Sequence, residues 1–234
     1  MKLRKILSIL GCFALVLMCA LTFVGCGEVE STKDEINDFL LEDGVETSFE
    51  DKGFKFDLYS RFGDAEVFKN GYVKMSGEIV PVDEDIEAKI YVEYFYEDSN
   101  SGMTIAFSGT YYIKDEKFYS TKTKNITSNP SDVMTSSLYD SVVSAAKGVS
   151  GAINEIISYE SDTNTTLTYQ KKGDLEKKNV EFTITAKNSI LKKTAFVKFN
   201  NGKIVEFLSD TDGEGASIKI SIKERNADYK YNQR

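Results

Sequence analysis

Apolar and polar residues alternate along much of this chain, and this alternation constrains the fold more than any other feature of the sequence. The clearest run is IEAKIYVEY at 86–94, in which every second residue is apolar. A period of two places successive side chains on opposite faces of a strand, one buried and one in water. Such strands are typical of antiparallel sheets. Similar runs occur at 54–58, 73–79, 103–113, 180–186, 195–199 and 216–222.

Two Asn-Gly pairs lie among these runs. Asn70 and Gly71 precede the run at 73–79, and Asn201 and Gly202 follow the run at 195–199. An Asn-Gly pair between two strand patterns is a strong signal for a two-residue hairpin, because both central residues of that turn need a positive φ. We therefore predict a hairpin at each pair.

A helix is predicted before the first strand. Thr32 and Glu35 have the spacing of a capping box, in which each side chain binds a free backbone N–H of the other residue. Ile36 and Phe39 follow with helical spacing. The predicted helix runs over 33–43.

The middle of the chain breaks the strand pattern. From Met134 to Ile156, apolar residues recur every three or four positions, which is the spacing of an amphipathic helix. Gly148 and Gly151 lie inside this stretch, and each costs a helix interior about 1 kcal/mol relative to alanine. We therefore predict one long helix or two short ones, ending near Ser158, with a kink or break at the glycines.

The predicted order is a helix, about five strands, the helical insertion and about five more strands. This order predicts an α+β fold class. We expect a single large, curved, half-barrel-like antiparallel sheet of about ten strands, with the N-terminal helix and the helical insertion packed on one face. The single domain is expected over 32–225, and the unpatterned residues 226–234 are expected to form a C-terminal tail.

The first 25 residues have the composition of a leader. Lys2, Arg4 and Lys5 precede a stretch without any charge at 6–25. A basic start followed by an apolar segment is typical of a secretory signal peptide, which we predict over 1–25. The alternative is a retained transmembrane anchor, because about 20 apolar residues can span a bilayer.

The apolar stretch ends at Phe23, Val24, Gly25 and Cys26, which resemble the lipobox of bacterial lipoprotein precursors. The resemblance implies cleavage before Cys26 and attachment of a diacylglyceryl group and a palmitate to that residue. It also implies a cell-membrane location on the extracytoplasmic face. Residues 26–31 would then form a short lipid-anchored tether.

The residue types present exclude several classes of chemistry. The sequence has no histidine, and its three cysteines, at 12, 19 and 26, all lie in or next to the leader. The usual general base, nucleophile pairs and zinc ligands are therefore missing from the domain. Glu87, Glu93 and Glu97 alternate with an apolar face and fit a solvated strand face; the alternative is a carboxylate pair for glycoside hydrolysis. We expect no catalytic residues, no enzyme activity and no cofactor.

Charge and ligand spacing also limit the partners. The formal net charge of −8 disfavours nucleic acid, whose phosphates need basic side chains. The segment DTDGEG at 210–215 resembles the start of a calcium loop, but Ser221 occupies the position that would need glutamate. We predict a turn there and no metal site, with a weak cation site as the alternative. The sequence identifies no protein partner.

The segments GTYYIKDEKFYS at 109–120 and FVKFNNGKIVEF at 196–207 look like strand pairs of a known group. Together with the element order, they make the chain similar to the lipoprotein carrier fold of LolA and LolB and the lipid-binding lipoproteins of the LprG and LppX type. The resemblance implies a hydrophobic cavity for an acyl-chain ligand.

A curved sheet facing a helical insertion predicts a cavity between the two, with an apolar or amphipathic ligand inside. The alternative function is a scaffold or a protein- or polymer-binding module of the cell envelope, with a solid core and no ligand cavity. The residues predicted to line the cavity are Met103, Ile105, Phe107, Met134 and Leu138.

Overall fold

The structure is a computed structural model of the whole chain. It describes residues 27–49, 52–63, 68–82, 85–98, 100–114, 117–120, 126–127, 133–213 and 216–225. The predicted leader 1–25, the predicted lipid-attachment residue Cys26 and the predicted tail 226–234 lie outside the described residues.

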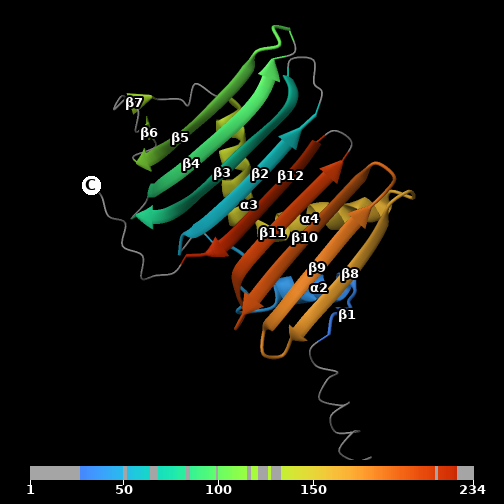
Figure 1. Cartoon of the computed structure of the whole chain (residues 1–234). Coiled ribbons are helices and arrows are strands. Elements are labelled where there is room, and N and C mark those ends of the chain that lie inside the picture. The colour runs from blue at the N-terminus through green and yellow to red at the C-terminus, as the bar shows by residue number, and fades with distance from the viewer. Residues whose placement is uncertain are drawn as a thin grey trace, which may run out of the picture.

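The described strands form one antiparallel sheet of twelve strands, which is not closed (Figure 1). Its order is β1-β8-β9-β10-β11-β12-β2-β3-β4-β5-β6-β7. The strands are β1 (Val29–Glu30), β2 (Phe54–Phe62), β3 (Phe68–Val82), β4 (Asp85–Asp98), β5 (Thr104–Lys114), β6 (Lys117–Ser120), β7 (Ile126–Thr127), β8 (Thr166–Asp174), β9 (Asn179–Lys187), β10 (Leu191–Asn200), β11 (Lys203–Gly213) and β12 (Ala216–Glu224). The edge strands β1 and β7 have two residues each, so the ten longer strands confirm the predicted number.

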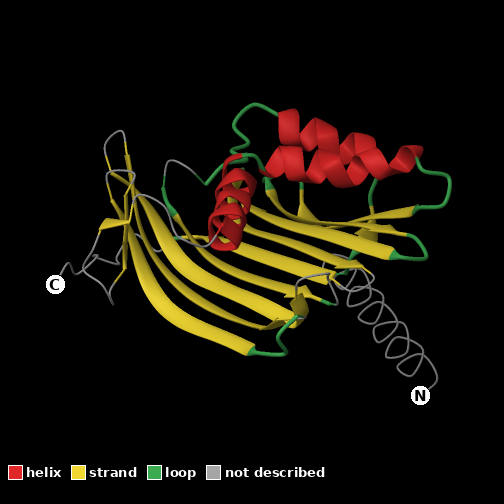
Figure 2. Cartoon of the chain, turned by 90° about the horizontal axis from the view of Figure 1, so that it is seen from above, coloured by secondary structure: helices red, strands yellow, loops and turns green. Residues whose placement is uncertain are grey.

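The two predicted blocks of strands meet in the middle of the sheet. β12, the last strand, pairs with β2, the first long strand, through nine residues from Ala216 with Phe62 to Glu224 with Phe54. The sheet therefore joins the start and the end of the domain. In the chain, the helical insertion lies between the two blocks, after β7 and before β8. Figure 2 shows that the sheet is curved and that the helices lie on one side of it. These features confirm the predicted α+β fold class.

The helices are α2 (Lys33–Leu41), α3 (Val133–Lys147), α4 (Val149–Ser158) and the 3₁₀ turn η2 (Tyr159–Ser161). The insertion breaks at Gly148, where a break was predicted, and Gly148 becomes the N-cap of α4. Because of this break, α3 packs on β2 and β12 whereas α4 packs on β9 and β10. α3 therefore covers the join between the two blocks of strands, and α4 covers the second block.

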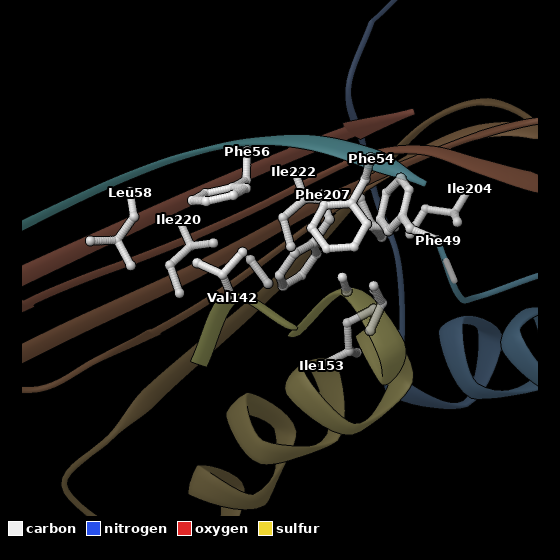
Figure 3. Packing of buried hydrophobic residues seen from close by; sticks show 14 of the residues in the cluster. Phe49, Phe54, Phe56, Leu58, Val142, Ile153, Ile204, Phe207, Ile220 and Ile222 are labelled. Atoms are coloured by element: carbon white, nitrogen blue, oxygen red, sulfur yellow. The ribbon is translucent and has the colours of Figure 1, made fainter. Parts of the chain in front are cut away.

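The sheet and the helices share one apolar core (Figure 3). We call the side of the sheet that carries the helices the inner face and the opposite side the outer face. Phe56, Phe207 and Ile222 point from the inner face towards Val142 and Ile153 of the helices, and all five are at most 2% exposed. The apolar area buried at this close-packed interface stabilises the fold.

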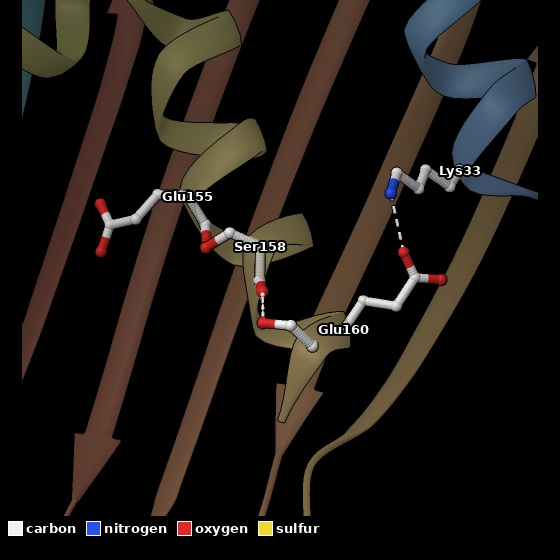
Figure 4. Close-up of polar contacts among 5 residues, drawn as sticks. Lys33, Glu155, Ser158 and Glu160 are labelled. Atoms are coloured by element: carbon white, nitrogen blue, oxygen red, sulfur yellow. Dashed lines mark hydrogen bonds and ion pairs between the residues drawn. The ribbon is translucent and has the colours of Figure 1, made fainter. Parts of the chain in front are cut away.

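The N-terminal helix begins at the predicted cap. Thr32 Oγ1 accepts a hydrogen bond of 3.2 Å from the backbone N–H of Glu35. The ring of Phe39, buried under α2, packs edge-on against Phe182 at 5.3 Å and Phe199 at 5.0 Å between ring centroids. Lys33 also forms an ion pair of 2.7 Å with Glu160 of η2 (Figure 4). The helix is therefore fixed to the sheet by apolar contacts and to the insertion by an exposed ion pair.

The prediction of a hairpin at Asn70-Gly71 is wrong, whereas that at Asn201-Gly202 is confirmed. Asn201 and Gly202 have φ of 50° and 78° and join β10 to β11. Asn70 and Gly71 instead lie inside β3, where the pairing with β4 shifts register. A Cβ at Gly71 would lie 2.0 Å from the ring of Phe62. The glycine leaves room for the ring of Phe62 and does not form a two-residue turn.

Candidate functional site

Aromatic side chains lie on both faces of the part of the sheet made by β3, β4 and β5. On the inner face, Tyr94 of β4 pairs with Phe107 of β5, and their rings stack at 5.2 Å with an interplanar angle of 20°. Tyr96 stacks on Tyr94 at 5.9 Å, and Tyr111 lies 6.2 Å from Phe107. We call these four residues the inner aromatic row.

The inner aromatic row continues the core along β4. Ala88, Ile90 and Val92 are each at most 2% exposed, whereas Tyr94, next on the same face, is half-buried. Met103, just before β5, is 64% exposed. The inner face thus changes from a closed aliphatic core to a partly open aromatic surface towards the loop between β4 and β5. Such a surface can bind the apolar part of a ligand.

The structure describes the side chains of two of the five residues predicted to line the cavity. Phe107 is half-buried on the inner face, and Met103 is exposed. Ile105 pairs with Tyr96 in the backbone register, but its side chain lies outside the description, as do the side chains of Met134 and Leu138 in α3. That these residues line one cavity therefore stays a prediction.

Sequence reasoning missed three members of the inner aromatic row as lining residues, namely Tyr94, Tyr96 and Tyr111. The alternation in β4 and β5 held the signal for them, because the register places them on the same face as Phe107. Which face was concave could not be read from the alternation alone. The helices decide it, since they pack on this face (Figure 2).

The outer face of the same strands carries a pocket of about 430 Å³. Its lining on the outer face is formed by Tyr72, Tyr91, Glu93, Phe95, Ala106 and Ser108, and Tyr94 and Phe107 of the inner aromatic row also border it. The register places Ala106 opposite Phe95 and Ser108 opposite Glu93. Two small side chains of β5 therefore face two large ones of β4, and this difference in size makes the hollow.

A polar group lies at the edge of this pocket. The phenol of Tyr72 donates a hydrogen bond of 2.8 Å to Glu93 Oε1, and Lys74 Nζ lies 3.5 Å from the same oxygen. The hydrogen bond from Tyr72, together with the charge of Lys74, lowers the pKa of Glu93. Glu93 is therefore ionised at neutral pH, and Lys74 balances its charge. The side chain of Glu93 is 33% exposed, as expected for a solvated strand face.

The described residues contain no group of three or more His, Cys, Asp or Glu side chains placed to hold a metal ion. Asp210 and Asp212, which began the calcium-like segment, lie within β11. Within the same described part of the chain, no helix is both long enough and apolar enough to cross a membrane.

No family profile and no curated protein matches this chain. Among solved structures, the crystal structure of LprF from Mycobacterium bovis is similar, with a TM-score of 0.45 and 10% sequence identity. The match covers 87% of this chain and 98% of that one. At this distance, the likeness carries no argument about the fold or the ligand of this chain.

Proposed function

We propose that this chain is a non-catalytic, membrane-anchored lipoprotein that binds an apolar or amphipathic, lipid-like ligand on its inner face, between the β4–β5 strands and α3. The observation that carries the proposal is the inner aromatic row, which extends the buried core into a partly open apolar surface. The ligand's apolar part would cover this surface and complete the core.

The energetics favour an acyl chain. Burial of apolar area contributes about 25 cal/mol per Å², or about 0.8 kcal/mol for each CH₂ group. A chain that passes over Tyr94, Phe107 and Tyr111 would contact chiefly their aromatic rings. Its affinity would rise with the number of methylene groups in contact.

The anchor is proposed at Cys26, from the lipobox-like FVGC at 23–26. Two acyl chains hold a protein at a membrane where a single chain gives only reversible binding. Val29 and Glu30 of β1 already pair with Lys171 and Gln170 of β8. Only Gly27 and Glu28 lie between Cys26 and this edge of the sheet. An extended chain spans at most about 3.6 Å per residue, so the edge lies close to Cys26. The domain would therefore sit close to the membrane surface, where lipid-like ligands are available.

Native mass spectrometry tests the ligand. The full-length chain, produced with its leader and extracted from membranes in mild detergent, should carry a non-covalent lipid in addition to the mass of its anchor. Release of that lipid by organic solvent should restore the mass of the protein with its anchor alone. A full-length chain that carries only its covalent anchor, whatever detergent is used, contradicts the proposed ligand.

The second candidate is a polymer- or protein-binding module of the envelope. One specific observation favours it, namely the pocket on the outer face, whose side chains Tyr91, Glu93, Phe95, Ala106 and Ser108 do not belong to the inner aromatic row.

A further inference from the structure

We propose that the outer-face pocket is a carbohydrate-binding site that takes a neutral glycan chain. Its outer-face side chains are distinct from those of the proposed lipid site, because alternate side chains of β4 and β5 point to opposite faces; Tyr94 and Phe107 of the inner aromatic row border both. The inference rests on the shape of the pocket, on the aromatic residues around it and on the balanced charges at its edge.

The shape suits a flat, ring-sized group. Tyr91 and Phe95 stand four residues apart on β4, which is about 13 Å along a strand. Glu93, Ala106 and Ser108 lie between and beside them and complete the lining. The hollow is therefore bounded by aromatic rings at both ends and by small or polar side chains in the middle.

Aromatic residues extend this site across neighbouring strands. Tyr59 of β2 stacks on Tyr72 of β3 at 6.3 Å, and Tyr72 stacks on Phe95 of β4 at 5.9 Å. Tyr59 is 38% exposed and Tyr91 is 43% exposed. Tyr59, Tyr72 and Phe95 thus form a line over three strands, and Tyr91 lies about 13 Å along β4 from Phe95. An extended ligand made of repeated rings could contact several of them at once.

The polar groups suit hydroxyls. Glu93 offers carboxylate acceptors, Lys74 offers ammonium donors and Ser108 offers a hydroxyl that can do both. A sugar ring has an apolar C–H face for the aromatic rings and hydroxyls around its edge for these polar groups. Both kinds of surface in the pocket are then satisfied by one ligand.

Other ligand classes fit less well. A hydrocarbon chain would remove the Glu93–Lys74 pair from water without replacing its hydrogen bonds, which is costly. Phosphates of a nucleic acid would meet a carboxylate on a protein of net charge −8. A cationic head group would find Lys74 Nζ already 4.8 Å from the centroid of the Tyr72 ring and already paired with Glu93.

The test is a binding titration of the full-length protein in detergent with three neutral hexasaccharides: chitohexaose, cellohexaose and maltohexaose. We expect at least one to bind with a Kd of about 1 mM or tighter. Tyr91→Ala should weaken that binding about tenfold, and Ser108→Phe, which fills the hollow without removing a ring, should abolish it. Tyr112→Ala is the matched control, because it removes a ring from the outer face of β5 outside the pocket.

Three results would overturn the inference. The first is no binding of any of the three hexasaccharides at about ten times the expected Kd. The second is binding that Ser108→Phe leaves unchanged. The third is a concentration-dependent dimer that Tyr91→Ala disrupts, because a second copy of the chain would then be the occupant. Since Ser108→Phe should not change the amount of co-purified lipid, failure of this site is distinguishable from failure of the proposed function.

Discussion

The ring of Tyr94 on β4 stacks on the ring of Phe107 on β5, with the two centroids 5.2 Å apart and the planes inclined by 20°. The pair lies on the inner face, next to Val92, which is 1% exposed. It therefore marks the place where the closed core gives way to a partly open aromatic surface. The proposed ligand would bind at this boundary.

Replacement of Phe107 should weaken ligand binding. Phe107→Ala removes the central ring of the inner aromatic row, and loss of one aromatic contact should lower the amount of co-purified lipid about tenfold, equivalent to about 1.4 kcal/mol. Tyr112→Ala on the same strand but on the outer face should leave the lipid content unchanged. Quantitative lipid extraction from equal amounts of the two full-length variants gives the comparison. Equal losses in both would argue against an inner-face site.

A prediction about the apolar core concerns Ile153. This α4 residue is fully buried against the inner face of the sheet. Ile153→Ala should lower the free energy of unfolding by about 2–5 kcal/mol, because it removes buried methyl groups and leaves a cavity. Asn154→Ala, next to it on the exposed side of the helix, should change stability by less than about 0.5 kcal/mol. Urea unfolding followed by circular dichroism measures both. A small effect at Ile153 would mean that α4 does not pack on the sheet as described.

The cap of α2 gives a smaller and more local prediction. Thr32→Ala removes the acceptor for the Glu35 N–H and should cost about 1 kcal/mol of stability. Thr32→Ser keeps a hydroxyl at the same position and should stay close to the parent. If both variants unfold at the same urea concentration, the hydrogen bond does not contribute as described.

Glu35 makes the stability depend on pH. Hydrogen bonds from Lys171 and from Ser31 lower the pKa of Glu35 below its ordinary value of 4.5. A lowered pKa in the folded state means that the ionised carboxylate stabilises the fold above the pKa of the unfolded chain. This contribution is lost as the pH falls through the lower, folded-state value. Glu35→Gln should therefore cost about 0.5–1 kcal/mol near neutral pH.

The same comparison at low pH provides the check. At pH values below the folded-state pKa, where the parent carboxyl is protonated, Glu35→Gln and the parent should have nearly equal urea midpoints. A difference that stays constant from neutral to acid pH would assign the effect to packing rather than to the charge of Glu35.

The lipobox interpretation predicts the behaviour of Cys26→Ser. Without a thiol, the diacylglyceryl group cannot be attached, so the variant should be retained as an uncleaved precursor or released without lipid. Labelling of the cells with a fatty acid, followed by fractionation, separates these outcomes from the parent. A Cys26→Ser chain that is labelled, cleaved and membrane-bound like the parent would show that Cys26 is not the attachment residue.

Much of the fold could be predicted from the sequence because strand and helix periods differ. The period of two in 86–94 and 216–222 predicted strands that the structure contains in β4 and β12. The cap at Thr32 and the break at Gly148 were also predicted, since both depend on local chemistry. Local signals of this kind need no knowledge of distant contacts.

The features that the sequence did not predict depend on contacts between residues far apart in the chain. The Asn-Gly pair at 70–71 has the same local preference as that at 201–202, but it lies within β3, where Gly71 pairs with Phe62 of β2 and leaves room for its ring. The inner aromatic row depends on which face the helices cover, and alternation alone does not choose a face. The outer pocket depends on small residues of β5 standing opposite large residues of β4, and only the register shows that.

Site-specific photo-crosslinking tests the central claim most directly, because it reports which face of β5 contacts the ligand. A photo-reactive phenylalanine analogue is placed at position 107 or, for comparison, at position 112 of the full-length chain in native membranes. Irradiation followed by mass spectrometry should give covalent lipid adducts at position 107 and none at position 112. Adducts at position 112 alone, or equal adducts at both positions, would contradict an inner-face ligand site.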